Sequence, residues 1–383
     1  MPGRPRILSI SFSHFPSDAR VLRQLAILRE FGDVTTVGYG DGPDGVVEHL
    51  SIPAHLPSLP QTPTGVAALA LHRFRAVELA APAVRAALEL IGERRFDVIV
   101  ANEARALPLA HAVRRGARIW GDMHEWAPEE RTHVLSWRLL VAPYMRWVCA
   151  GYLPGTDAVT TVNRSIADLY ETQFGIACEV VRNAIPRQPL QPSPPEPGRI
   201  RLVHSGGAVP GRNIEALIDA TLMLDDRFTL DLYLVQAKQD GGYFDDLGRR
   251  ASGADRVTIH PAVTPAELPG VLNRYDLGVY ALPQATVNHR LMLPNKFFDF
   301  VQARLGLVFG PAVETDALID RYGLGVVTAG YSAADIADAL RPLDGDAVRD
   351  FKAASDRASA ELSSEADEST ERAILARLVA SAA

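Results

Sequence analysis

The chain has 383 residues, 47% of them hydrophobic, and carries a formal net charge of −7 with a pI near 5.8. This length suits two domains of ordinary size, and the acidic balance excludes the broad positive surface of a nucleic-acid-binding protein. The two cysteines, Cys149 and Cys178, have no metal-binding spacing and indicate a reducing compartment. We expect a cytoplasmic protein, because neither a signal-peptide core nor an apolar run of about 18 residues occurs.

Strands and helices alternate along the first half of the chain. Buried apolar runs predict strands at 6–13, 34–39, 96–101, 118–123, 158–162 and 179–182. Helical periodicity predicts helices at 18–31, 107–115 and 134–152, another that ends at 174, and a long Ala/Leu-rich helix that ends near 91. Such an alternation indicates a parallel, doubly wound sheet.

A proline-rich segment then interrupts the alternation. Residues 186–198, PRQPLQPSPPEPG, contain six prolines and no apolar run, which is typical of a semi-extended linker. Strands at 201–205, 229–235, 257–260 and 277–281 and a helix at 213–223 follow, and residues 346–383 read as helical throughout. We predict an α/β protein with two Rossmann-like domains, 1–188 and 200–362, joined by a linker at 189–199 and facing across a cleft. Ligands of such sheets bind outside the carboxyl ends of the strands.

The stretch 288–311, NHRLMLPNKFFDFVQARLGLVFGP, combines a polar loop, a short helix and a buried strand. Pro294 suits the start of the helix, where its missing N–H costs nothing. A helix N-terminus favours an anion such as phosphate, and Lys296 would add a full positive charge there. Asp299, one turn later, could accept hydrogen bonds from the hydroxyls of a ribose. An ordinary surface ion pair between Lys296 and Asp299 is the alternative interpretation.

A second candidate for phosphate binding is the segment 205–213, SGGAVPGRN, between a strand and a helix. Gly206 and Gly207 would let the backbone approach a ligand closely, and Arg212 could bind an oxyanion as a planar fork. The dinucleotide pattern G-x-G-x-x-G is absent. The alternative is a tight turn between strand and helix with a solvated arginine.

Polar residues also follow the strands of the first half. Asp122-Met123-His124-Glu125 ends one strand, at the edge where functional side chains gather in such folds. Asn102 and Glu103 end another strand and could line a pocket, although an ordinary polar loop is equally consistent. Asp18 and Arg20 lie in the loop after the first strand, where Asp18 could simply cap the next helix.

The run PNKFFDF, at 294–300, resembles the PNK(L/F)FE(Y/F) segment of family 4 glycosyltransferases, which have the two-domain GT-B fold. The resemblance implies that Asp299 corresponds to the second of two glutamates in a longer signature and binds the nucleotide ribose. The first glutamate falls on Leu291, which departs from the family pattern. Asn288 or His289 could replace that donor contact.

The segment SGGAVPGRN is similar to the family's G-R-x-x-x-x-K-G pattern, whose Arg and Lys hold the diphosphate. Gly206 matches, Gly207 stands at the Arg position, and Arg212 stands at the Lys position. By the same resemblance, Lys296 and Arg212 act in catalysis and Asn295 belongs to the donor site. The C-terminal helix, 363–383, is expected to return to the first domain.

The resemblance also implies roles in the first domain. His124 would contact the donor sugar and count among the catalytic residues, with Asp122 and Glu125 orienting it. Residues that would touch the acceptor are Asp18, Arg20, Asn102 and Glu103. The implied reaction transfers a sugar from a nucleotide-diphosphate sugar to a glycan, lipid-linked or small-molecule acceptor, with retention of configuration. No metal or cofactor is expected, and the sequence has no Asp-x-Asp metal motif.

Other interpretations stay open. The departures at Leu291 and Gly207 are also consistent with a non-catalytic relative that binds nucleotide sugars, and a sugar-nucleotide epimerase is a further alternative. A two-domain small-molecule binding protein is a third. The aromatic-rich segment 137–153, WRLLVAPYMRWVCAGYL, could contact the inner face of a membrane peripherally, although its two arginines suit a core helix better.

Overall fold

The computed structural model describes residues 3–237 and 242–382, which divide into two compact units. The first unit contains Met1–Arg182, Thr286–Asn288 and Asp367–Ala383, and the second contains Asn183–Ala285 and His289–Ala366. Each unit holds one sheet in which every pairing of neighbouring strands is parallel. Among the described residues, no helix combines the length and apolarity needed to cross a membrane.

The sheet of the first unit has seven strands in the order β3-β2-β1-β4-β5-β6-β7. Its strands are β1 (Arg6–His14), β2 (Asp33–Tyr39), β3 (Glu48–Ile52), β4 (Val98–Asn102), β5 (Arg118–Met123), β6 (Ala158–Thr161) and β7 (Glu179–Val180). The central strands β1, β4 and β5 are buried almost end to end, as expected for a parallel sheet covered on both faces. The strand order reverses between β1 and β4, which is where doubly wound sheets place their ligands.

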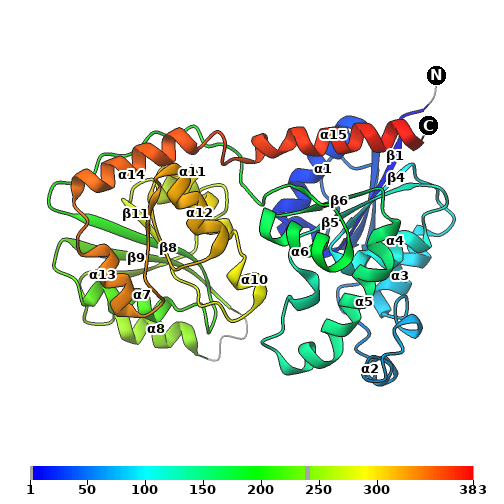
Figure 1. Ribbon diagram of the computed structural model, residues 1–383, viewed down its shortest axis with the longest axis horizontal. Coiled ribbons are helices and arrows are strands. Elements are labelled where there is room, and N and C mark those ends of the chain that lie inside the picture. The colour runs from blue at the N-terminus through cyan, green and yellow to red at the C-terminus, as the bar shows by residue number, and fades with distance from the viewer. Residues whose placement is uncertain (1–2, 238–241, 383) are drawn as a thin grey trace. The chain divides into compact units, whose positions relative to one another are not determined.

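Helices cover both faces of this sheet (Figure 1). They are α1 (Ala19–Phe31), α2 (Pro63–Ala70), α3 (Pro82–Ile91), α4 (Leu107–Ala112), α5 (Ala142–Tyr152), α6 (Arg164–Phe174) and most of α15 (Ser364–Ala382). Short turns are η1 (Phe15–Ser17), η2 (Phe74–Ala76), η3 (Ala104–Ala106), η4 (Ala127–Glu129) and η6 (Leu153–Gly155), and η5 (Trp137–Val141) is a π-helix. The C-terminal α15 packs beside α1, because Ile374, Leu375 and Leu378 join the same apolar cluster as Val21 and Leu25 (Figure 1).

The sheet of the second unit has six strands in the order β10-β9-β8-β11-β12-β13. Its strands are β8 (Ile200–Ala208), β9 (Phe228–Gln236), β10 (Val257–Pro261), β11 (Leu277–Tyr280), β12 (Gly306–Phe309) and β13 (Gly325–Val327). The helices are α7 (Ile214–Leu222), α8 (Tyr243–Ala251), α9 (Leu268–Leu272), α10 (Val287–Arg290), α11 (Asn295–Gln302), α12 (Val313–Tyr322), α13 (Ala333–Leu340) and α14 (Gly345–Ala358). Two apolar clusters lie in this unit, and Phe297, Phe298 and Phe300 of α11 form the centre of one.

The structure differs from the predicted elements in several places. The long helix that was to end near 91 is broken into α2, η2 and α3, because Pro82 cannot lie inside a helix and begins α3 instead. The region 346–383 holds two helices, α14 and α15, with a break close to the point where the chain passes from the second unit to the first. Strand β3 was not predicted from the sequence at all.

The proline-rich segment is part of the second unit and does not behave as a free linker. The first continuous segment of the first unit ends at Arg182, six residues before the boundary predicted at residue 188. Gln188 donates its backbone N–H to Gln302, and its carbonyl accepts from Arg304. Ser193 donates to the carbonyl of Asn273. Prolines supply no N–H to a strand, so these few polar residues anchor the segment.

Candidate functional site

The carboxyl end of β8 brings Gly206 against the ammonium group of Lys296. A Cβ atom built on Gly206 would lie 2.8 Å from Cε and 3.1 Å from Nζ of Lys296. Gly206 also has a φ of +151°, which L side chains rarely adopt. Glycine is therefore needed here both for its backbone angle and for the close approach of the lysine.

Lys296 and Arg212 lie in one electrostatic group. Burial lowers the pKa of Lys296, the charge of Asp299 opposes this shift, and the charge of Arg212 adds to it. Arg212 is exposed and forms a side-chain hydrogen bond with Tyr280. Among the described residues, the Lys296 ammonium makes no ion pair with a carboxylate. Two cations that repel each other in this way would both gain from an anion placed between them.

His204, on the same strand as Gly206, is buried and faces both cations. Burial lowers its pKa to about 4, and the charges of Lys296 and Arg212 contribute to the shift. Its Nδ1 lies 2.9 Å from the carbonyl of Val279, so the neutral ring donates from Nδ1 and keeps Nε2 as an acceptor. The imidazole therefore adds no third positive charge at neutral pH.

Helix α11 begins beside this group. Pro294 is the N-cap residue of α11, whereas the sequence suggested that it is the first residue of the helix. The first N–H groups of the helix therefore belong to Asn295 and the residues after it. Asn295 is exposed, and its side-chain oxygen accepts a hydrogen bond from Asn183. Asp299 is partly buried one turn later, and Gly207 is exposed. The hydroxyl of Ser205 is buried and has no hydrogen-bond partner among the described residues.

Neither Leu291, where the family's first glutamate is missing, nor Asn288, which was suggested in its place, offers a polar group to a donor. Leu291 is buried, so it offers no polar contact. Asn288 belongs to the first unit, where its side chain accepts from the backbone N–H of Trp126 and donates to the carbonyl of the same residue. Because both ends of this buried amide are used by Trp126, the structure does not support the predicted role of Asn288 in donor binding.

In the first unit, Asp122 at the end of β5 is the centre of a buried network. Arg20 donates two hydrogen bonds to its carboxylate, from Nη2 at 2.6 Å and from Nε at 2.9 Å. Gln24 and Thr160 donate to it as well. Burial alone would raise the pKa of Asp122, but the charge of Arg20 and the hydrogen bonds from Arg20 and His124 hold it far below its usual range. The carboxylate is therefore ionised at every physiological pH.

This network corrects the prediction for Arg20. The side chain is buried, and its remaining Nη1 donates to the carbonyl of Val181. A guanidinium with all its groups directed inward cannot also bind an acceptor. Arg20 instead holds Asp122 in position.

His124 lies directly on the network. Its Nε2 is 3.1 Å from Oδ2 of Asp122, and because that carboxylate only accepts, Nε2 carries the hydrogen. In the neutral ring, Nδ1 is then free to accept a hydrogen bond, for example from a sugar hydroxyl. The nearest carboxylate to Nδ1 is Glu103, at 3.9 Å, which is beyond hydrogen-bond distance. Asp122 thus has the orienting position predicted for it, whereas Glu125 is exposed.

Glu103 has a strained backbone next to this histidine. Its φ of 67° and ψ of 157° lie in a region that is populated almost only by glycine. The side chain is held by Arg105, which donates from both Nε and Nη2. Strain of this kind persists where the surrounding structure enforces it, and such residues cluster at functional sites.

The other residues proposed for the acceptor side have local partners. Asn102 is buried, its amide nitrogen donates to Ser9 and to the carbonyl of Ile10, and its side-chain oxygen has no partner among the described residues. Asp18 caps α1 by accepting from the backbone N–H of Val21. The capping role explains Asp18 fully, and an acceptor role for either residue stays a prediction.

The sequence did not point to several residues of these two groups. Thr160 and Gln24 come from β6 and α1, and Glu371 comes from α15. Glu371 is buried close to Arg20 and Asp122, and burial, with the charge of Asp122 adding to it, raises its pKa to about 7. Only folding brings these segments together. The sequence could have indicated His204 as a site residue, because it directly precedes the glycine-rich segment.

Comparison with known proteins gives a family match over part of the chain and a fold. Residues 33–188 match the sequence model of Glycosyltransferase Family 4. No curated protein matches the chain. Among solved structures, Anabaena Alr3699/HepE in complex with UDP-glucose shares 15% identity, with a TM-score of 0.66, over 97% of this chain and 100% of that one.

Two synthases have the same fold. Sucrose-phosphate synthase from Thermosynechococcus elongatus is 14% identical, with a TM-score of 0.68, over 99% of this chain and 100% of that one. The alpha,alpha-trehalose 6-phosphate synthase from Burkholderia multivorans is 12% identical, with a TM-score of 0.66, over 100% of both chains. The predicted resemblance to family 4 glycosyltransferases is therefore confirmed over residues 33–188, and the predicted GT-B fold of two parallel α/β sheets is confirmed over the whole chain.

Proposed function

We propose that this protein is a hexosyltransferase that moves a sugar from a UDP-sugar to an acceptor hydroxyl. The observation that carries the proposal is the pair of cations at the carboxyl end of β8, where the half-buried Lys296 lies against Gly206 and is repelled by Arg212, with Asp299 as the carboxylate that acts on the lysine. One carboxylate for two cations leaves a net positive charge, which a nucleotide diphosphate would neutralise. The family match over residues 33–188, together with the UDP-glucose bound by Anabaena HepE, supports the choice of donor.

The proposed roles follow from this placement. Lys296, Arg212 and the first N–H groups of α11 bind the diphosphate, while Gly206 and Gly207 allow close approach. Asp299 binds the ribose, and Asn295 borders the donor. His124, oriented by Asp122, contacts the donor sugar through Nδ1. Asn102 and Glu103 face the acceptor. No metal or cofactor is part of the proposal.

In the proposed reaction, the bond between the anomeric carbon and the phosphate oxygen breaks, and its electron pair leaves on UDP. The acceptor oxygen forms a new bond to the anomeric carbon, and its proton ends on the departing phosphate. Lys296 and Arg212 stabilise the negative charge that develops on the leaving group, which is where preorganised cations accelerate a reaction most. We propose that configuration is retained. The acceptor is a glycan, a lipid-linked sugar or a small molecule, and a cytoplasmic location with peripheral membrane contact fits the lipid-linked case.

The decisive experiment measures UDP-sugar binding and turnover separately. A thermal-shift panel of nucleotide sugars should raise the melting temperature most with UDP-sugars, because a ligand that binds only the folded state stabilises it. Release of UDP, measured with and without added acceptors, should then report catalysis. Lys296→Ala should reduce turnover about 10²–10³-fold while the protein stays folded. Arg349→Ala, which removes an exposed arginine of α14, is the matched control and should change neither property.

The outcomes separate the alternatives. Binding of UDP-glucose without any release of UDP would identify a non-catalytic nucleotide-sugar-binding protein, as the departures at Leu291 and Gly207 allow. Conversion of the donor sugar into its epimer would identify an epimerase. Absence of binding to every nucleotide sugar, or full turnover by a folded Lys296→Ala variant, would refute the proposal.

A further inference from the structure

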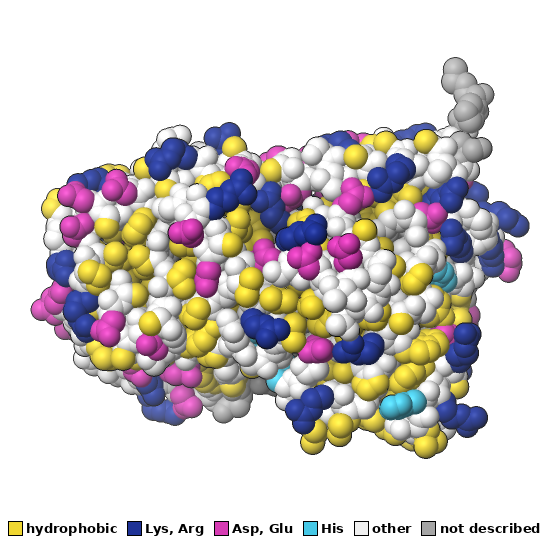
Figure 2. All heavy atoms as spheres, viewed as in Figure 1, with side chains coloured by type: hydrophobic (Ala, Val, Ile, Leu, Met, Phe, Trp, Pro, Cys, Tyr) yellow, Lys and Arg dark blue, Asp and Glu magenta, His cyan; other side chains and the backbone are white. Residues whose placement is uncertain are grey.

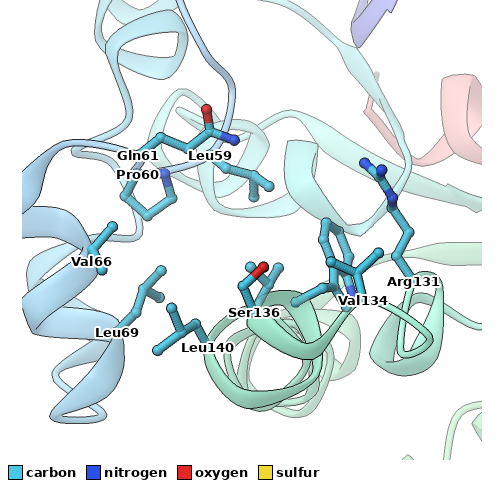
Figure 3. A pocket seen from close by; sticks show the side chains of 11 residues that line it. Leu59, Pro60, Gln61, Val66, Leu69, Arg131, Val134, Ser136 and Leu140 are labelled. Atoms are coloured by element: carbon cyan, nitrogen blue, oxygen red, sulfur yellow. The ribbon is translucent and has the colours of Figure 1, made fainter. Parts of the chain in front are cut away.

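A second, apolar cavity lies in the first unit, between α2 and the π-helix η5, and has no part in the donor site described above. Its volume is about 340 Å³. Val66 and Leu69 of α2 line one side and Leu140 of η5 lines another, as Figure 3 shows. The π-helix is defined by the backbone N–H of Ala142 donating to the carbonyl of Trp137, and such turns occur frequently at functional sites.

One buried hydrogen-bond donor at this cavity lacks an acceptor, and an exposed arginine lies beside it. Trp137 lines it and is only 7% exposed, yet its indole N–H has no hydrogen-bond partner among the described residues. A buried donor without a partner is unfavourable and needs an explanation. Arg131, which also lines the cavity, stands over the Trp137 ring at 5.7 Å. Within the described part of the chain, its guanidinium makes no ion pair, although Glu130 lies near enough for their charges to interact.

The surface around the cavity is apolar and carries arginines. Leu71, Leu135 and Leu139 are exposed by 70%, 59% and 59%. Residues 55–77 contain two arginines and residues 131–156 contain three, while Glu78, Glu129, Glu130 and Asp157 flank these two segments. Figure 2 shows hydrophobic side chains gathered over the α2 and α5 part of the first unit, with basic side chains among them.

A chain of contacts links the cavity wall to Glu103. Glu103 pairs with Arg105, and Arg105 donates through Nη1 to the hydroxyl of Ser58 at 3.2 Å. Ser58 directly precedes Leu59, which lines the cavity. One short chain of contacts within the first unit therefore connects the strained Glu103 with the apolar wall.

We propose that the cavity between α2 and η5 binds the hydrocarbon part of an anionic amphiphile, whose phosphate or carboxylate is held by Arg131 and the indole N–H of Trp137. The apolar walls suit a hydrocarbon chain, and the residues that line the cavity include Arg131 but no carboxylate, which suits a negative head group. Resting on the proposed function, this amphiphile is the acceptor, with the hydroxyl to be glycosylated near Glu103.

The experiment measures binding of decyl phosphate, below the concentration at which it forms micelles, by titration calorimetry without nucleotide. Decanol serves as the uncharged probe of equal chain length. Decyl phosphate should bind at least tenfold more tightly than decanol. Arg131→Gln should abolish most of this preference. Trp137→Phe, which keeps an aromatic side chain but removes the N–H together with the five-membered ring of the indole, should weaken decyl phosphate binding about fivefold. Because Trp137 is buried, this change also leaves a small cavity and should lower the melting temperature slightly. Binding is therefore compared below the melting temperature of the variant.

A matched rim variant separates a single bound molecule from a membrane surface. Leu139→Ser changes an exposed side chain that does not line the cavity and should leave decyl phosphate binding unchanged. The proposal is overturned if decyl phosphate does not bind, if it binds no better than decanol, or if Leu139→Ser abolishes binding while Arg131→Gln does not. Sedimentation with anionic phosphatidylglycerol vesicles that depends on Leu139 but not on Trp137 would likewise replace the cavity by a bilayer-docking surface.

Acceptor use is tested last. With UDP-glucose turnover established, Arg131→Gln should raise the KM for an anionic amphiphilic acceptor at least fivefold. A failure of decyl phosphate binding leaves UDP-sugar turnover intact, whereas a failure of the proposed function removes turnover and leaves this binding intact. The two proposals therefore fail in distinguishable ways.

Discussion

The two sheets carry opposite arrangements of charge at their carboxyl ends. In the first unit, Asp122 receives hydrogen bonds from Arg20, Gln24 and Thr160, and the charges are matched inside the protein. In the second unit, Lys296 and Arg212 repel each other, and Asp299 is the carboxylate whose charge acts on the lysine. A network of hydrogen-bonded opposite charges stabilises the fold and holds its side chains in position. Two neighbouring cations instead favour the binding of an anion. The comparison suggests that the first unit orients His124 while the second binds the anionic part of the donor.

Removal of the central carboxylate of the first unit should have the largest effect. Asp122→Asn removes the hydrogen-bonded counter-charge of the buried Arg20 and leaves only the more distant Glu371 and Asp367, so the free energy of unfolding should fall by about 3–5 kcal/mol in urea titrations. Asp168→Asn, in an exposed pair with Arg164, is the control and should cost about 0.3–0.5 kcal/mol. Lys296→Met in the second unit should not destabilise, because burial already disfavours that charge. Equal losses in Asp122→Asn and Lys296→Met would contradict the comparison.

Glu371 should make stability depend on pH in the opposite direction to an ordinary carboxylate. Its pKa of about 7 in the folded chain exceeds the usual value of 4.5, so the folded state binds the proton between these values and stability falls as the pH rises through them. The groups around it are Arg20, Arg23, Asp122 and Asp367.

Glu371→Gln removes this titration. The variant should match the parent at pH 5 and be more stable at pH 8, by up to about 3 kcal/mol, in thermal melts at both pH values. Glu368→Gln, on the same helix and paired with Arg372, should not show this dependence. Should Glu371→Gln be equally stable relative to the parent at both pH values, the carboxyl would be ionised throughout.

The strained backbone at Glu103 gives a smaller effect that tests whether the first unit stores strain beside His124. Glu103→Gly and Glu103→Ala both remove the carboxylate, but only glycine relaxes the backbone angles. The free energy of unfolding of Glu103→Gly should therefore exceed that of Glu103→Ala by about 1–2 kcal/mol, after the entropy cost of glycine is included. Both variants should lose transferase activity if the carboxylate faces the acceptor. A more stable alanine variant would show that the backbone is not strained.

Sequence patterns reached the parts of this protein that depend on local order. Alternating strands and helices predicted the two parallel sheets, and the run around Lys296 pointed to a helix N-terminus that the structure places in α11. The resemblance to family 4 glycosyltransferases placed the segment SGGAVPGRN and the lysine in one site, and the contact of Gly206 with Lys296 agrees with that. Strand ends and helix starts depend on neighbouring residues, so a single sequence reveals them.

Tertiary structure decided everything that depends on partners distant in the chain. Arg20 and Asn288 looked like ligand contacts because their types suit that role, and the fold directs one to Asp122 and the other to the backbone of Trp126. The unpartnered indole of Trp137 and the raised pKa of Glu371 likewise follow from burial. A side chain's chemistry is set by its type, but whether that chemistry is already used inside the protein or left for a ligand depends on which groups the folded chain brings beside it.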